Sequence, residues 1–159
     1  MSFTLKSAFV SSLFLASGLG PAAPVGAQGD AACGGPPSAI HLNVNVEKVG
    51  SARGLIAVTL YPDEARKFLA KGGALYVVRV PARTPATRVC VNVPGPGVYA
   101  LGVYHDANSN RRFDRTALGL PAEHFGFSNN PKPFFGIPHF SGVRVRVARS
   151  GTWTTIRLN

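Results

Sequence analysis

The chain has few cysteines, few acidic residues and no long apolar run. Its 159 residues include two Cys, one Met and one Trp, and 7 acidic side chains stand against 17 basic ones, for a formal net charge of +10. Two cysteines are too few for a disulfide-dense mini-protein or for a zinc site built from three or four thiolates. With 15% charged residues, 18 Gly and 13 Pro, the chain is neither a coiled coil nor a disordered tail.

The N-terminus has the layout of a secretory signal peptide. Lys6 precedes an apolar run over 8–19, and a stretch of small residues ends at Ala27. This order predicts a signal peptide at 1–27, cut before Gln28. The alternative is a membrane anchor, but about a dozen apolar residues fall short of the roughly 20 that a spanning helix needs. We therefore expect a periplasmic or extracellular product with no transmembrane segment after processing.

Export predicts how the two cysteines are used. In an oxidising environment Cys33 and Cys90 are expected to pair, and closing a loop of this size stabilises a fold by about 4 kcal/mol in the chain-entropy account. The alternative is a reactive thiol, which needs a cationic, partly exposed niche. Gly and Pro around Cys33 predict a flexible leader at 28–39, before a single domain at 40–159.

Alternation of apolar and polar residues predicts strands along most of this domain. It begins at Ile40 and continues to Glu47. Further strand patterns, separated by Gly- and Pro-rich turns, occupy 55–61, 74–80, 87–93, 98–105, 143–148 and 152–158. About seven short strands predict an all-β fold, a two-sheet antiparallel Greek-key sandwich. The segment 62–69 begins with Pro and acids and carries its bases later, which predicts one short helix.

The segment from Asp106 to Ser141 departs from this pattern. It has no sustained alternation but is dense in Gly, Pro, Asn and Phe. A structureless connection of this length is usually functional or disordered, and its Phe rings favour an ordered loop packed on the sandwich. The predicted binding surface consists of Phe125, Phe127, Asn129, Asn130 and Phe135. The alternative is a purely structural cover.

Several blocks of this sequence resemble a known bacterial family. They are Pro96-Gly97-Val98-Tyr99-Ala100, His105-Asp106-Ala107-Asn108-Ser109-Asn110, Phe113-Asp114, Gly119-Leu120-Pro121 and Gly126-Phe127-Ser128-Asn129-Asn130. From about Ile40 onward, the chain is similar to the exported proteins grouped as domain of unknown function 2141. The resemblance implies a signal peptide and a sandwich of the transthyretin/prealbumin-like or Ig-like kind, as in carboxypeptidase-regulatory-like modules. It implies no substrate, since the family carries no established activity.

Oxygen-bearing side chains after His105 recur at a spacing that suits calcium. Relative positions one, three, five and nine are held by Asp106, Asn108, Asn110 and Asp114. Arg112 adds a backbone carbonyl at position seven. Position six is Arg111 in place of the usual Gly, and position twelve is Ala117 in place of Glu, so the loop is no EF-hand. The alternative is an Asx-turn loop whose side-chain oxygens bind nearby backbone N–H groups.

The histidines raise an alternative function. The chain has four, namely His41, His105, His124 and His139. His105, Asp106 and His124 are the candidate catalytic residues of a small hydrolase or metal-dependent enzyme, as acid/base groups or metal ligands. No two histidines lie at a ligand spacing such as H-E-x-x-H, so hydrogen-bonded loop histidines are the competing interpretation.

Arginine supplies 12 of the 17 basic residues. Because Arg favours bidentate contacts with phosphate and carboxylate, the predicted partner is an anionic envelope polymer or a lipid surface. Export and the lack of basic-aromatic interleaving speak against nucleic acid, and charge for solubility alone is the competing interpretation. The leading prediction is an exported, non-enzymatic binding or scaffolding module, with calcium as its candidate cofactor.

Overall fold

In the computed structural model of the chain, the described residues are 32–132 and 137–159. Their elements are, in chain order, β1 (Ile40–Glu47), β2 (Leu55–Pro62), β3 (Tyr76–Pro81), β4 (Ala86–Val93), β5 (Gly97–Asp106), β6 (Phe125–Phe127), the 3₁₀ helix η1 (Phe140–Val143), β7 (Arg144–Val147) and β8 (Thr152–Arg157). The predicted signal peptide at 1–27 and the predicted surface residue Phe135 lie outside this part of the chain. Within it, no helix has the length and apolar character needed to cross a membrane.

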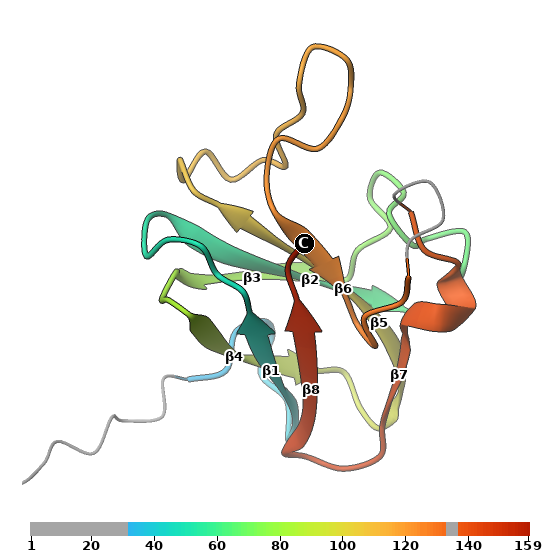
Figure 1. The fold of residues 1–159 in the computed structure, drawn as a ribbon. Helices are drawn as coiled ribbons and strands as arrows, with labels where there is room; N and C mark the ends of the chain where they lie inside the picture. Colours follow the sequence, from blue (N-terminus) through green and yellow to red (C-terminus); the bar gives the residue numbers. More distant parts are fainter. Residues whose placement is uncertain (1–31, 133–136) are drawn as a thin grey trace, which may run out of the picture. The chain divides into compact units, whose positions relative to one another are not determined.

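The strands form two sheets, which confirms the predicted all-β sandwich (Figure 1). One sheet has the order β4-β1-β8, and the other has the order β3-β2-β5-β6, with β7 also paired to β5. The sandwich is not wholly antiparallel as predicted, because β8 runs parallel to β1 from Leu42↔Thr152 to Glu47↔Arg157. Alternation along a strand sets which side chains face the core, but it carries no information about the direction of a partner.

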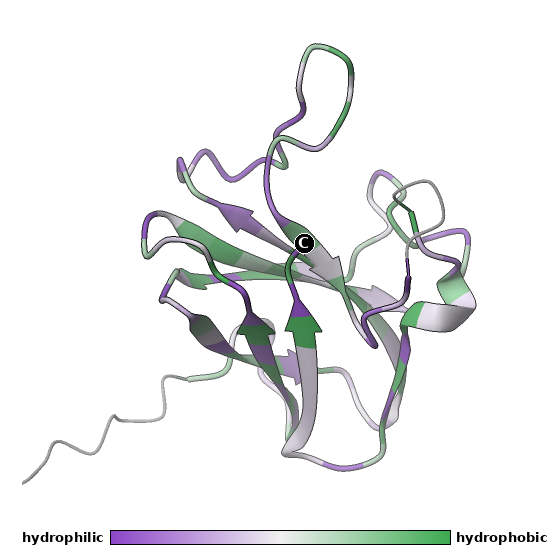
Figure 2. Cartoon of the chain, viewed as in Figure 1, coloured by the Kyte–Doolittle hydropathy of each residue, from purple (hydrophilic) through white to green (hydrophobic). Residues whose placement is uncertain are grey.

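Alternation places one face of each sheet in a common core. Leu42, Val44 and Val46 of β1 are fully buried, and Figure 2 shows the alternation as green and purple bands along this strand. Their core partners include Ile56 and Leu101 of the other sheet. Burial of such aliphatic side chains is the main favourable term in the folding of a small domain.

The predicted helix at 62–69 is wrong. β2 continues to Pro62, and the residues that follow form a series of turns. In these turns the N–H of each of Lys67, Ala70 and Gly73 binds the carbonyl three residues before it. A segment this short gains little from helical hydrogen bonds alone. Its Phe68 ring instead packs edge-on against the Tyr61 ring, with centroids 5.3 Å apart.

Loops cover the outer face of the β2–β5 sheet with a second apolar cluster. Its buried members are Tyr61, Ala100 and Val143, and Phe68, Phe127 and Phe140 pack against them. β6, which contributes Phe127, is an eighth strand inside the segment predicted to be an irregular loop. It pairs with β5 over three residues, too few for alternation to reveal it.

The predicted disulfide attaches the leader to the edge of the sandwich. Cys33 and Cys90 are bonded, with Cα atoms 4.5 Å apart. Gly34 donates its N–H to the Cys90 carbonyl and accepts the N–H of Asn92, both at 2.9 Å. A Cβ on Gly34 would lie 2.3 Å from the Val78 side chain, so only Gly lets this segment pass between β4 and β3.

Replacing both cysteines by Ser tests the contribution of this bond. The bond joins residues 57 positions apart, so its loss is expected to lower the free energy of unfolding by about 4 kcal/mol in the chain-entropy account. Urea unfolding of the double variant and of the reduced parent should give the same lowered midpoint, with an unchanged far-ultraviolet circular dichroism spectrum. An unshifted midpoint in both samples contradicts a stabilising role.

Candidate functional site

Asp106 ends β5 and organises the loop that follows. Its side chain is fully buried. Oδ1 accepts the N–H of Asn110 at 3.0 Å, and Oδ2 accepts the N–H of Arg111 at 2.8 Å. A buried carboxylate needs such donors, because burial without them is costly. The two hydrogen bonds therefore fix the backbone of the loop relative to the sheet.

Arg111 takes the conformation that glycine usually supplies at position six of a calcium loop. Its φ is 63°, in the left-handed region that side chains other than Gly rarely adopt. The hydrogen bond from its N–H to Asp106 holds it there. The missing glycine, which counted against a cation loop in the sequence, is therefore no geometric obstacle to the turn.

The remaining predicted ligands belong to the same network. Oδ1 of Asn108 accepts the Asn110 N–H at 3.0 Å, and Oδ1 of Asn110 accepts the Arg112 N–H at 2.8 Å. The amide nitrogens of Asn108 and Asn110 both donate to Oδ2 of Asp114, at 2.8 and 2.7 Å. The structure thus brings the four side chains together. Their arrangement is that of the Asx-turn loop, the alternative to a calcium loop in the interpretation of the sequence.

The network fixes the Asp114 carboxylate, and it also includes Glu123, which the sequence did not indicate. Hydrogen bonds from Asn110 and Asn108 lower the pKa of the Asp114 carboxyl. The backbone N–H of Asp114 in turn donates to Oε2 of Glu123 at 3.2 Å. Oε1 of Glu123 is buried and has no hydrogen-bond partner within the described chain.

Burial raises the pKa of Glu123, and the nearby Asp114 and Asp106 carboxylates raise it further. No ligand spacing links Glu123 to Asp114. It comes back to the loop because the hairpin between them closes, with the Ala122 N–H bonded to the Asp114 carbonyl at 2.9 Å. The only trace of this in the sequence is the turn-forming Gly119.

A cavity of ≈ 340 Å³ lies beside this network. Asn108, Asp114 and Glu123 line it together with Arg53 and Ser51. The cavity therefore lies between the loop that follows β5 and the turn that contains Ser51 and Arg53. His105, Asp106 and His124 are not among the side chains that line it.

The histidine rings of the enzymatic alternative are bonded to different backbone oxygens. His105 is 4% exposed, and its Nε2 lies 2.8 Å from the Arg53 carbonyl. The exposed His124 contacts a backbone oxygen of Asn159 through Nδ1. The two residues are joined through the backbone, where the His105 N–H binds the His124 carbonyl at 2.9 Å.

Comparison of the sequence with models of known families identifies the family to which the chain belongs. Residues 44–155 match the model of a family described as "Uncharacterized protein conserved in bacteria (DUF2141)". The chain belongs to this family. The match begins within β1 and ends within β8, and so includes the 106–124 loop. Comparisons with curated proteins and with solved structures gave no match.

In this DUF2141 chain, the two asparagines of the predicted binding surface make internal contacts. Asn129 donates to the Arg144 carbonyl at 2.7 Å. Oδ1 of Asn130 accepts the N–H of Arg157 at 2.7 Å, while its Nδ2 donates to the Thr155 carbonyl at 2.8 Å. The Asn130 amide therefore offers β8 the donor and acceptor that a neighbouring strand would offer, and it covers that sheet edge.

The two aromatic residues of that predicted surface belong to a row of ring contacts. Phe125 lies between Phe113 and Phe127, with centroid distances of 5.8 and 5.7 Å. Phe127 continues to Phe68 at 5.7 Å. Ser128, which was not among the predicted site residues, is fully buried, accepts the Leu101 N–H at 3.0 Å and donates to the Val143 carbonyl.

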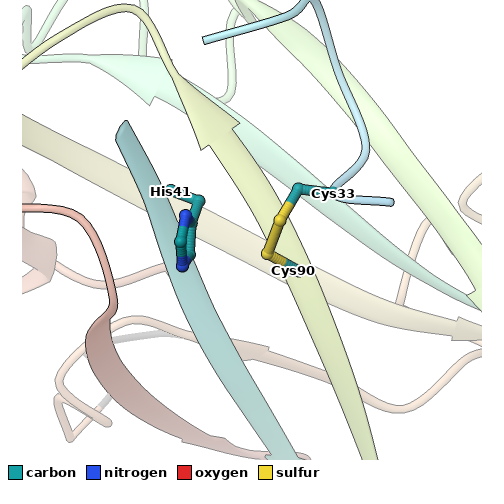
Figure 3. Close-up of side chains that lie close together, drawn as sticks. All are labelled: Cys33, His41 and Cys90. Atoms are coloured by element: carbon teal, nitrogen blue, oxygen red, sulfur yellow. A yellow bond between two sulfur atoms is a disulfide. The ribbon is translucent and has the colours of Figure 1, made fainter. Parts of the chain in front are cut away.

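A separate cluster lies on the outer face of the β4-β1-β8 sheet (Figure 3). Within the described ranges, Cys33, His41 and Cys90 form the one group of three His, Cys, Asp or Glu residues whose ligand atoms lie within 4.8 Å of one another. The two sulfurs are joined to each other and so are not thiolate ligands. Nδ1 of His41 lies 2.7 Å from the Ser150 hydroxyl. The cluster is a structural crosslink.

Replacing Glu123 by Gln tests the electrostatics of the loop. Because the folded-state pKa of Glu123 is raised, its ionised form weakens the fold above that pKa, and protonation removes this penalty as the pH falls through it. In calcium-free buffer the E123Q variant should therefore melt at a higher temperature than the parent at pH 7, and the difference should vanish in acid.

Glu64→Gln is the matched control. A hydrogen bond from Lys67 lowers the pKa of the half-buried Glu64, so the Glu64→Gln variant should gain no stability at pH 7. Thermal unfolding measured across the pH range separates the two variants. An E123Q variant that melts below the parent at neutral pH without calcium contradicts the assigned environment of Glu123.

Proposed function

We propose that this DUF2141 chain is an exported, non-enzymatic binding module of the bacterial cell envelope, with the 106–124 segment as its binding rim and calcium as the ion that stiffens it. The observation that carries the proposal is the single network joining Asp106, Asn108, Asn110, Asp114 and Glu123 at one edge of a rigid sandwich. The signal-like sequence of 1–27 and the Cys33–Cys90 bond support export, because disulfides persist outside the cytoplasm.

The donor set fits a hard cation. Carboxylate and amide oxygens are the ligands that calcium prefers, and the network holds three carboxylates, those of Asp106, Asp114 and Glu123. Their oxygens do not all lie within 4.8 Å of one another in this structure, so calcium would draw them together. The lowered pKa of Asp114 keeps it ionised at neutral pH, and the partnerless Oε1 of Glu123 has bonding capacity to spare. Calcium would replace the two amide N–H donors now bound to Asp114, with Asn108 and Asn110 turning their oxygens inward.

Arg112 is proposed to complete the set through its backbone carbonyl. Three arginines, Arg111, Arg112 and Arg115, balance the three carboxylates, so the loop carries no net negative charge. Calcium therefore binds weakly, in the class of about 0.1 to 1 mM that extracellular modules use.

Structural use of the candidate catalytic groups supports a non-enzymatic role. Asp106 is committed to two backbone amides, and His105 is buried against a carbonyl. A general acid or base needs to reach a substrate proton, and both of these side chains are buried in this structure. Binding at the exposed rim needs no such access.

Melting temperature as a function of calcium tests the proposal. At about 5 mM free calcium, a site of this affinity class adds about 1 to 2 kcal/mol of stability, since only the folded chain binds. We expect a rise of a few degrees over the value in chelator, and a smaller rise with magnesium, which gives up its water less readily.

Two aspartate variants locate the effect. Asp114→Asn should abolish most of the calcium response, whereas Asp63→Asn should keep it, because Asp63 pairs with Arg144 outside the loop. Equal melting temperatures in calcium and in chelator contradict the calcium site. A response lost equally in both variants places the ion elsewhere.

A further inference from the structure

The hairpin at 115–121 presents apolar side chains to solvent. Leu118 is 86% exposed and Leu120 is 60% exposed. The hairpin is closed by the Arg115–Pro121 bridge and by the Thr116 N–H bonded to the Leu120 carbonyl at 2.8 Å. In Figure 1 it is the orange loop that projects away from the two sheets. Its leucines are therefore displayed at a tip and do not pack in the core.

The tip contains no acidic residue. From Thr116 to Ala122 the sequence is Thr-Ala-Leu-Gly-Leu-Pro-Ala, and every one of these residues is exposed. Gly119, with φ 79°, makes the turn that leaves both leucines pointing outward from an ordered backbone. An ordered apolar tip in water is unfavourable for an isolated chain and marks a site of contact with an apolar phase or surface.

Basic side chains stand at the base of this tip. Arg111, Arg112 and Arg115 are all exposed. Arg115 is fixed by a 2.9 Å hydrogen bond from Nη1 to the Gly119 carbonyl and lies 5.3 Å from the Phe113 ring centroid. The acid among them, Asp114, accepts two amide donors. Asp114 and Glu123 are partly buried and Asp106 is fully buried, so the exposed charged side chains at the base of the hairpin are the three guanidinium groups. The chain as a whole has a net charge of +10.

We propose that the 115–121 hairpin inserts Leu118 and Leu120 into the interface of an anionic phospholipid bilayer while the three arginines contact lipid phosphates. The inference rests on the proposed envelope-binding function and names its partner. In a bilayer interface the acyl chains lie deeper than the phosphates. The hairpin has the same order, with leucines at its tip and guanidinium groups at its base, so each could contact its counterpart. A hydrated anionic polymer would satisfy the arginines and leave the leucines in water.

Vesicle co-sedimentation of the processed, oxidised chain tests this proposal, first in chelator. We expect binding to vesicles of phosphatidylglycerol and phosphatidylethanolamine, weakened by salt, and little binding to phosphatidylcholine alone. The Leu118→Ser/Leu120→Ser variant should bind the anionic vesicles about tenfold or more weakly, because two leucine side chains lose their transfer from water. Trp153→Ser is the control, since Trp153 is 59% exposed on β8 and outside the hairpin.

A second pair of variants tests the charges. Arg111→Gln/Arg112→Gln should reduce binding by about fivefold or more, in keeping with the contribution of basic side chains near an anionic surface. Arg146→Gln/Arg149→Gln removes the same charge from exposed positions on β7 and the turn after it, and it should bind like the parent. Equal losses in the two pairs overturn a localised site.

Three results overturn the inference. They are failure to bind anionic vesicles at low salt, full binding by the leucine variant, and a dimer in light scattering that disappears in the leucine variant while vesicles stay unbound. The last result would identify a second copy of the chain as the occupant of the tip. If the melting temperature of the chain rises normally with calcium but the chain does not bind vesicles, the proposed lipid partner is wrong. The proposed calcium site in the 106–124 segment is unaffected by that result.

Discussion

The two hydrogen bonds accepted by the buried carboxylate of Asp106 are the constraint on which the rim depends. They tie the amides of Asn110 and Arg111 to the end of β5, the strand that also pairs with β2, β6 and β7. A buried carboxylate without these donors would be costly, and without the carboxylate the Arg111 N–H would lose the acceptor that holds this residue in its left-handed conformation. The positions of Asp114, Glu123 and the hairpin between them follow from this anchor.

The sandwich supplies a rigid base because two sides of it are covered. The disulfide-bound segment at Cys33 and Gly34 lies along β4, and the Asn130 amide bonds to the edge of β8. An unpaired strand edge can pair with a strand of another chain and so lead to aggregation. Both contacts therefore protect the sheet edges from such pairing as well as stabilise the fold. The loop that carries the candidate site starts from β5 in the other sheet, which pairs with β2, β6 and β7.

The positions of the described strands other than β6, and the disulfide, could be predicted from the sequence, because alternation reports burial and the two cysteines of a chain predicted to be exported have one partner each. The direction of β8 relative to β1 could not be predicted, because the two strands are far apart in the chain and alternation carries no information about strand direction. Asp106, Asn108, Asn110 and Asp114 were found by spacing, whereas Glu123 depends on a hairpin that folds back. Asn129 and Asn130 stay a predicted surface, although their amides bond to the chain itself. Polar residues in a loop look alike in sequence whether they bind a ligand or a neighbouring strand.

Amide hydrogen exchange, resolved residue by residue by NMR, tests the role of Asp106 most directly. If its carboxylate organises the rim, the Asn110 and Arg111 amides are protected in the parent chain although the loop around them is exposed. An Asp106→Ala substitution then removes that protection while the amides of β1 and β4 stay slow. Exchange of the two amides at free-peptide rates in the parent would contradict the account.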